Sequence, residues 1–159
     1  MKIQLRPAIE IDLPEVYSLI QELATYEKAP EEVTITIEDL RKDGFGEHPL
    51  FEIIIAELEN EIVGMAFYFI SYSTWKGKCI YLEDIIVRHS HRGKGYGKLL
   101  FEAVILKSKT FGAKRLSWQV LNWNEPAIHF YKKYNASIND EWLNGRLIEE
   151  QINNIEDNF

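Results

Sequence analysis

The stretch Ile85-Ile86-Val87-Arg88-His89-Ser90-His91-Arg92-Gly93-Lys94-Gly95-Tyr96-Gly97 joins an apolar, β-branched run to a glycine-rich turn. An amphipathic segment follows at once, with apolar side chains at Leu99, Leu100, Ala103 and Val104. The pattern predicts a strand, a glycine loop and the start of a helix. Such a loop turns backbone N–H groups and the positive end of a helix dipole towards phosphate, with no side chain in the way. We therefore expect a pyrophosphate-binding loop here.

The spacing of the glycines limits the ligands that this loop could bind. A dinucleotide fingerprint requires a third glycine three residues after the second, and that position is Lys98. A Walker A loop requires Ser or Thr after Gly-Lys and a glycine five residues before that pair, where Leu99 and Arg92 stand. The remaining pattern is R-x-x-G-x-G from Arg92 to Gly97. A glycine-rich turn without a ligand is the structural alternative.

A second motif follows about thirty residues later, as Asn124-x-x-Ala127-x-x-x-Tyr131. Steps of three and four residues place these three positions on one face of a helix. A tyrosine there suits acyl transfer from a thioester, because a phenol with a pKa of about 10 is protonated at neutral pH and can donate to a leaving thiolate. The alternative is that Tyr131 belongs to the apolar face of the helix.

The composition predicts one globular domain over residues 1–159. The hydrophobic content is 46% and the formal charge is −7, which disfavours nucleic acid as a partner and suits a cationic substrate. No membrane-spanning stretch or signal peptide is predicted. The single Cys79 is expected to be a packed strand residue, and it fits a reducing compartment, so we expect a cytoplasmic protein.

Hydrophobic periodicity predicts a mixed α/β domain with a central, partly antiparallel sheet flanked by helices. The first helix is expected to begin with a capping box formed by Asp12 and Glu15. Strands are expected at 3–6, 51–57, 62–72, 79–88, 115–120, 136–138 and 146–151, and helices at 13–26, 37–42, 96–110 and 124–134.

Both motifs together resemble the GCN5-related N-acetyltransferase (GNAT) superfamily, which has the acyl-CoA acyltransferase fold. The stretches 22–27, 43–49, 81–84 and 123–126 are further similar to the diamine (spermidine/spermine) acetyltransferases and their thialysine-acetylating relatives. The resemblance implies acetyl-CoA as co-substrate, a small primary amine as acceptor, direct attack in a ternary complex, and a homodimer. No metal is expected, because the histidines lack the spacing of metal ligands.

The resemblance also implies the roles of individual residues. Tyr131 is expected to be the general acid, and Glu83 to accept the amine proton; a solvated acid at a strand end is the alternative for Glu83. The amine site is expected at Tyr26, Glu27, Glu83 and Asp84. The expected cofactor-binding residues are Ile85, Ile86, Val87, Arg92, Gly93, Lys94, Gly95, Tyr96, Gly97, Asn124, Glu125, Pro126, Ala127 and Tyr131. We expect Arg88 and Lys98 to add positive charge for the phosphates.

One segment departs from the diamine pattern. Leu143 stands where polyamine-specific members carry an acidic residue, although Asp140 and Glu141 precede it. Either the loop still presents an acid, or the specificity has moved towards a shorter substrate than a polyamine. The resemblance implies a diamine or polyamine as acceptor, with lysine, thialysine or a protein amine as the alternative. A regulator that binds acyl-CoA without turnover is a further alternative. Because an alkylamine is protonated at neutral pH and must lose a proton to attack, we expect an alkaline optimum.

Overall fold

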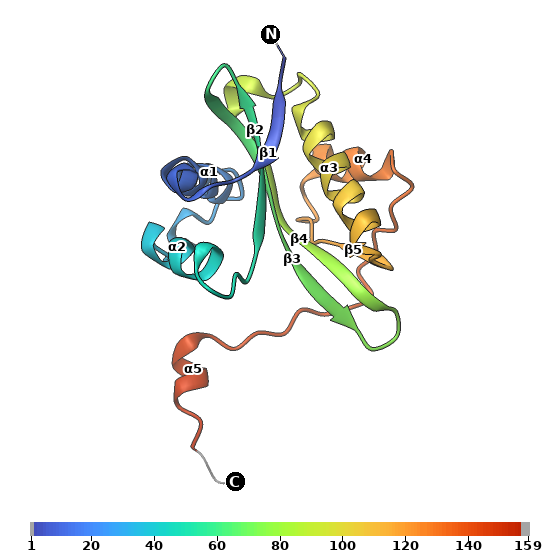
Figure 1. Ribbon diagram of the computed structural model, residues 1–159. Coiled ribbons are helices and arrows are strands. Elements are labelled where there is room, and N and C mark those ends of the chain that lie inside the picture. The colour runs from blue at the N-terminus through green and yellow to red at the C-terminus, as the bar shows by residue number, and fades with distance from the viewer. Residues whose placement is uncertain (1, 157–159) are drawn as a thin grey trace. The chain divides into compact units, whose positions relative to one another are not determined.

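The structure is a computed structural model that describes residues 2–156 (Figure 1). The chain forms two compact units, of which the first ends at Gln119 and the second begins at Val120. A single domain over residues 1–159 stays a prediction. Among the described residues, no helix is both long enough and apolar enough to cross a bilayer.

A five-stranded mixed sheet forms the centre of the first unit, which confirms the predicted fold class. Its strands lie in the order of the chain, the first four antiparallel and the last parallel to its neighbour. The strands are β1 (Gln4–Pro7), β2 (Glu52–Leu58), β3 (Glu61–Ser73), β4 (Gly77–Val87) and β5 (Arg115–Ser117). β5 is therefore shorter than the predicted strand at 115–120.

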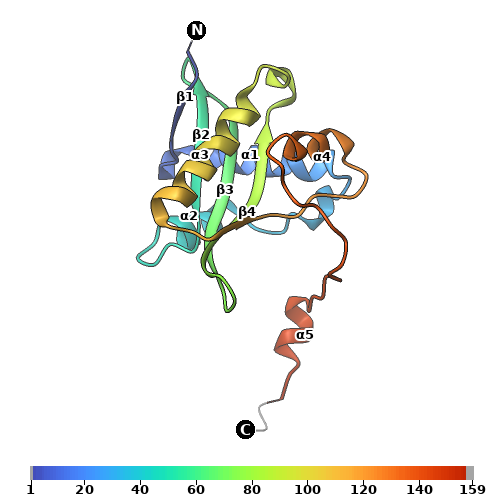
Figure 2. The ribbon, with the colours of Figure 1, turned by 90° about the vertical axis from the view of Figure 1, so that its right-hand side faces the viewer.

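Helices cover both faces of this sheet, as Figures 1 and 2 show. α1 (Leu13–Tyr26) and α2 (Ile37–Phe45) lie on one face, and α3 (Tyr96–Phe111) lies on the other. Short 3-10 turns stand at Glu10–Asp12, Pro30–Glu32 and His89–His91. Apolar residues of α1, α2 and the strands form a buried cluster: Leu13, Val16, Leu19, Leu40, Ile53, Ile55, Ile62, Met65 and Ile86. Cys79 is fully buried in β4, as expected.

The close packing of α3 on the sheet depends on a glycine in β3. A Cβ at Gly64 would lie 2.7 Å from the Ile86 carbonyl oxygen and 3.2 Å from Leu100 Cδ1. Real Cβ atoms do not approach a carbonyl oxygen this closely, so only glycine fits here without a shift of the backbone. The absence of a side chain thereby leaves room for the β4 backbone and for Leu100 of α3 beside Gly64.

The start of α1 differs from the predicted capping box. The Asp12 carboxylate caps no helical N–H; it accepts from the Ile9 N–H at 2.8 Å and pairs with Arg6 at 2.8 Å. Arg6 also pairs with Glu57 of β2 at 2.6 Å. The prediction was wrong because a cation on β1, six residues away, binds the carboxylate that would otherwise have capped the helix.

The second unit contains α4 (Glu125–Lys132) and α5 (Glu149–Asn153). α4 ends before the predicted Tyr134, and Asn135 has a left-handed φ of 56° where the chain leaves the helix. The strands predicted at 136–138 and 146–151 are wrong, because no strand of the described chain pairs with either segment. Instead the Gln151 side chain accepts the Ile148 N–H at 2.9 Å, which starts α5.

Candidate active site

β4 carries an extra residue at Glu83. Phe67 of β3 lies opposite Asp84, and the next residue, Tyr68, lies opposite Leu82, so Glu83 has no partner in the register. A bulge of this kind bends the strand and redirects its side chains. In a regular strand Glu83 and Asp84 would point to opposite faces; here Glu83 is exposed and Asp84 is half-buried.

Three carboxylates form an acidic cluster around this bulge: Glu27, which follows α1, and Glu83 and Asp84 of β4. The pKa of Asp84 is raised to about 7, chiefly by burial and in addition by the negative charges of Glu83 and Glu27. Burial also raises the pKa of Glu27. These shifts indicate a site with surplus negative charge that is poorly hydrated, which a bound ammonium group would neutralise.

The sheet opens beside the acidic cluster. β5 pairs with β4 only from Cys79 to Tyr81, whereas β4 continues to Val87. Beyond Tyr81, β3 is the only strand that pairs with β4 in the described part of the chain. One edge of the second half of β4 is therefore not paired with any described strand, and apart from the Val87 carbonyl, which accepts from Arg92 Nε, it suits a ligand that lies along it.

The main-chain groups at this edge follow from the alternation of an antiparallel pair. The Arg88 N–H donates to the Val63 carbonyl of β3 at 2.8 Å. Alternate residues face the other way, so Ile85 and Val87 direct their N–H and C=O groups away from β3. This orientation suits the predicted contacts with the amides of a pantetheine arm. Ile86 faces β3, so its predicted role stays a prediction without support from this geometry.

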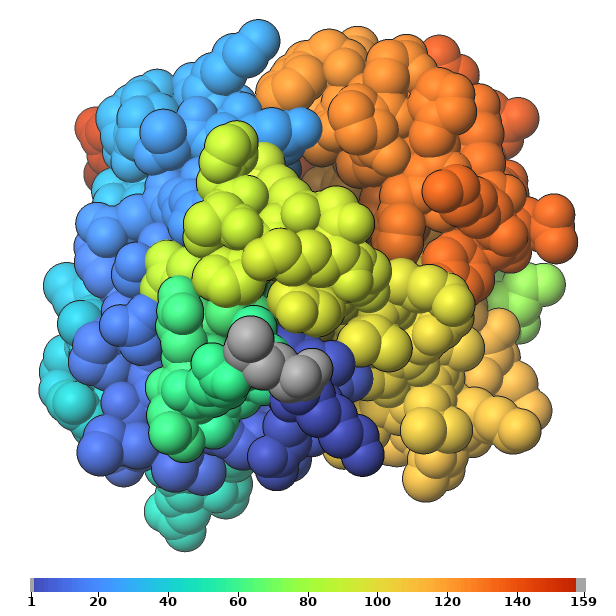
Figure 3. All heavy atoms as spheres, turned by 90° about the horizontal axis from the view of Figure 1, so that it is seen from above, coloured from blue at the N-terminus to red at the C-terminus, as the bar shows by residue number. Residues whose placement is uncertain are grey.

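The glycine loop has the properties of an anion cradle. Gly93 and Gly95 have left-handed φ values of 76° and 86°, and a Cβ at either would meet nothing within 4 Å. Gly95 is the N-cap of α3, and no side chain caps that helix end. The first-turn N–H groups, including that of Gly97, lack helical acceptors. Figure 3 shows the segment, in yellow-green, open on the surface. These features fit a pyrophosphate.

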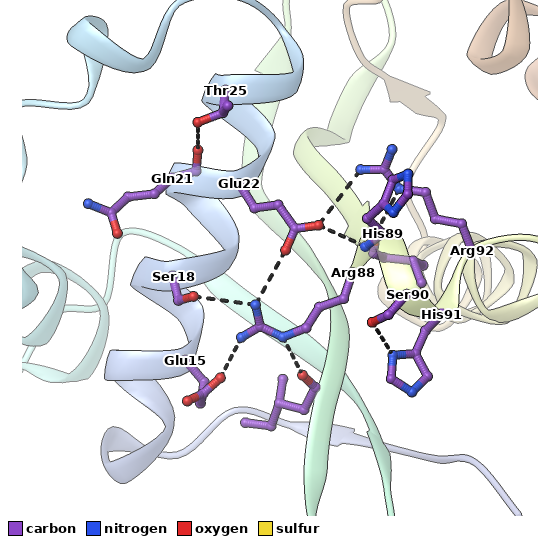
Figure 4. Close-up of polar contacts among 12 residues, drawn as sticks. Glu15, Ser18, Gln21, Glu22, Thr25, Arg88, His89, Ser90, His91 and Arg92 are labelled. Carbon is purple, nitrogen blue, oxygen red and sulfur yellow. Dashed lines mark hydrogen bonds and ion pairs between the residues drawn. The ribbon is translucent and has the colours of Figure 1, made fainter.

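The basic residues near the loop differ in what they contact. Arg92 donates from Nε to the Val87 carbonyl at 3.0 Å, and its guanidinium carbon lies 4.7 Å from the centre of the Tyr26 ring. Lys98 pairs with Glu102 at 3.6 Å. Arg88 points to α1 and bonds its side chains, so the expectation that Arg88 serves the phosphates was wrong (Figure 4).

The second predicted motif lies on α4 in the second unit. The Asn124 side chain caps this helix by accepting the Ala127 N–H at 3.3 Å, and Glu125 and Pro126 occupy the first turn. Tyr131 is buried, and its ring centre lies 5.2 Å from that of Phe130. The predicted helix is confirmed, and the roles of these residues towards a ligand stay predictions.

Comparison with known proteins decides the family. The model of the Acetyltransferase (GNAT) family matches residues 13–136. The chain belongs to this family. It is 40% identical to thialysine N-epsilon-acetyltransferase of Bos taurus in a 142-residue alignment that covers 84% of this chain and 84% of that protein. It is 33% identical to spermidine/spermine N(1)-acetyltransferase-like protein 1 of Homo sapiens over 94% of this chain and 23% of that protein.

A solved structure shows the same fold. An integron cassette protein from the mobile metagenome of V. cholerae matches with a TM-score of 0.78 and 25% identity over 96% of each chain. The sequence relatives place the protein in the diamine-acetyltransferase branch of the GNAT family. The protein is an acetyl-CoA-dependent N-acetyltransferase.

A pocket and the arrangement of possible metal ligands complete the description of the site. A pocket of about 500 Å³ lies among β1, β2, Tyr68 of β3, α3, the end of α2 and the segment that follows α2, and none of the predicted site residues lines it. Within residues 2–156, no group of three or more His, Cys, Asp or Glu side chains is arranged to hold a metal ion.

Sequence reasoning did not find the contacts that Glu22 of α1 makes with the turn before the glycine loop. The Glu22 carboxylate accepts the N–H of His89, 67 positions later in the chain. A long-range contact of this kind leaves no periodicity or spacing in the sequence. The unusual burial of Asp84 was missed for the same reason, because it follows from the bulge and from the packing of α1.

Proposed function

We propose that the protein acetylates a primary amine of a small cationic substrate, a diamine or polyamine. The observation that carries this proposal is the acidic cluster of Glu27, Glu83 and Asp84 at the open end of β4. A substrate with a second cationic nitrogen would be held by one carboxylate while its reacting nitrogen lies near another. The −7 charge of the chain would favour the approach of such a substrate.

A diamino acid is the second candidate, and the relative from Bos taurus favours it, because that protein is a thialysine N-epsilon-acetyltransferase of nearly equal length. Leu143 agrees with this candidate, because the resemblance to the diamine acetyltransferases implies an acid at this position in the polyamine-specific members. Such a substrate carries an α-carboxylate, which the acidic cluster would repel. The side-chain amine would therefore enter the cluster and the carboxylate would stay outside it.

In the mechanism that we propose, acetyl-CoA supplies an acetyl thioester, held by the glycine loop and the open edge of β4. The acidic cluster binds the ammonium form of the amine. Asp84, whose pKa is raised to about 7, is ionised at alkaline pH and can then accept the proton, directly or through water. Glu83, the predicted proton acceptor, is exposed and suited to hold the charged amine; its catalytic role stays a prediction.

Departure of the thiol requires a proton, and we assign its donation to the Tyr131 phenol. Arg92, Gly93, Lys94, Gly95, Tyr96 and Gly97 are proposed to bind the pyrophosphate, and Asn124, Glu125, Pro126 and Ala127 to border the pantetheine arm. Tyr26 is proposed to border the amine. We also propose that the chain acts as a cytoplasmic homodimer. Analytical ultracentrifugation at micromolar concentration would then give twice the mass of one chain.

Thiol release from acetyl-CoA tests the function directly. The purified protein is assayed with spermidine, spermine, putrescine, lysine and thialysine over a range of pH from about 6 to 10. We expect release with at least one of these amines and a rate that rises with pH. Tight CoA binding without release for any amine would refute the enzyme function and favour a regulator that binds acyl-CoA.

A further inference from the structure

The turn before the glycine loop is tied to α1 by a network of polar contacts (Figure 4). Its centre is Glu22, on the third turn of α1. One carboxylate oxygen of Glu22 accepts the His89 N–H at 2.8 Å and lies 3.9 Å from Arg92 Nη2. The other oxygen accepts from Arg88 Nη1 at 3.3 Å. Glu22 therefore contacts three of the five residues between β4 and Gly93.

Arg88 fixes the same turn to the rest of the fold. Its Nε donates to the Ile62 carbonyl at 3.1 Å, and its Nη1 donates to the Ser18 hydroxyl at 3.3 Å. Its Nη2 bonds the Glu15 carboxylate. The Arg88 side chain is 18% exposed, and charge-assisted hydrogen bonds at this exposure restrict its position strongly. The end of β4 is thus held against two turns of α1.

α1 also leads to the acidic cluster, which is the proposed amine site. Glu22 lies one turn before Tyr26, whose ring stacks with Arg92, and Glu27 follows directly. We propose that Glu22 is a positioning residue that holds the pyrophosphate loop in its binding geometry and couples it to the amine site through Arg92 and Tyr26. This inference rests on the proposed function of the loop.

The hydrogen bond from the His89 N–H to Glu22 carries the proposal, because it fixes the position of the backbone just before the glycine loop. A competing effect has the opposite sign: Glu22 is an anion near a phosphate site, so its removal alone would tighten CoA binding. Positioning predicts that CoA binds more weakly when the bond to His89 is lost. The sign of the change in affinity therefore separates the two effects.

The first test is the affinity of the protein for CoA, measured by titration calorimetry. We expect Glu22→Ala to raise Kd about tenfold, and Glu22→Gln to recover most of the affinity because its amide oxygen can still accept the His89 N–H. Glu15→Ala is the matched control: it also removes a carboxylate that bonds Arg88, but none that contacts the loop. We expect its Kd to stay within about twofold of the native value.

A second pair of variants changes the donor of the same bond, the His89 N–H. His89 is the first residue of its 3-10 turn, and Arg88 before it has φ −49° and ψ 139°, a conformation compatible with a following proline. His89→Pro removes the N–H and leaves Glu22 in place, whereas His89→Ala keeps the N–H. We expect His89→Pro to weaken CoA binding about tenfold and His89→Ala to leave it nearly unchanged.

Turnover supplies a readout that a general loss of stability would not produce. For Glu22→Ala we expect KM for acetyl-CoA and for the amine to rise together, with a smaller change in kcat. Native or tighter CoA binding in both Glu22→Ala and His89→Pro would overturn the positioning role. If the native protein itself binds no CoA, the proposed function fails and the inference fails with it.

Discussion

Replacing the half-buried Asp84 with asparagine should stabilise the free protein at alkaline pH. The pKa of Asp84 is raised from 3.8 to about 7, chiefly by burial and then by Glu83 and Glu27. The folded chain therefore keeps this proton to a higher pH than the unfolded chain does. Between these two values the folded state binds more protons, so its stability falls as pH rises.

The size of the effect follows from the shift. Each pH unit of difference corresponds to about 1.4 kcal/mol, so a shift from 3.8 to about 7 costs at most about 4 kcal/mol above pH 7. Water that enters the open end of the sheet lowers this cost. Asp84→Asn has almost the same volume and carries no charge, so it should recover this free energy without leaving a cavity.

Urea denaturation of the protein without substrate, from about pH 4 to about pH 8, measures this difference. The gain in unfolding free energy from Asp84→Asn should be near zero at the acid end and reach its full size above pH 7. Glu83→Gln is the control: it removes a neighbouring charge that is exposed, so its gain should be smaller. A gain for Asp84→Asn that is absent or the same at every pH would refute the reasoning.

Three further predictions concern catalysis and stability. Tyr131→Phe should lower kcat by about 10²-fold or more with little change in the Kd for CoA, and an unchanged kcat would exclude the phenol as the proton donor. Arg6→Ala should cost about 3 kcal/mol in thermal or urea unfolding because it leaves the buried Asp12 unpaired; full stability would show that the pair is dispensable. Gly64→Ala should cost about 1–3 kcal/mol because its Cβ would lie 2.7 Å from a carbonyl oxygen of β4, whereas Gly145→Ala, where a Cβ meets nothing within 4 Å, should be neutral in the same assay.

The sequence alone determined those features that depend on neighbours in the chain. Apolar runs bounded by polar turns predicted the first four strands, and helical spacing predicted α1, α3 and α4 to within a few residues at each end. Gly93 and Gly95 were informative because a left-handed φ favours a residue without a Cβ. The family resemblance followed from these same local patterns.

Short polar segments near the end of the chain were predicted less well. The segment 146–151 contains the apolar pair Leu147 and Ile148, but a strand requires a partner, and no strand in the described residues supplies one. The local cap from Gln151 to Ile148 decides the structure there and begins a helix. Asp12 shows the opposite case, in which a long side chain on another element displaced the local cap.

Tertiary structure decided which charged groups act together. The bulge at Glu83 arises from the pairing of β4 with β3. The approach of Glu27 from the end of α1 to Asp84 joins residues more than fifty positions apart, and the two together produce the acidic cluster. The bond from His89 to Glu22 likewise joins two distant parts of the chain. Sequence spacing identified the residue types that suit acetyl transfer, whereas their pKa values and contacts arise from burial and from pairing between distant segments.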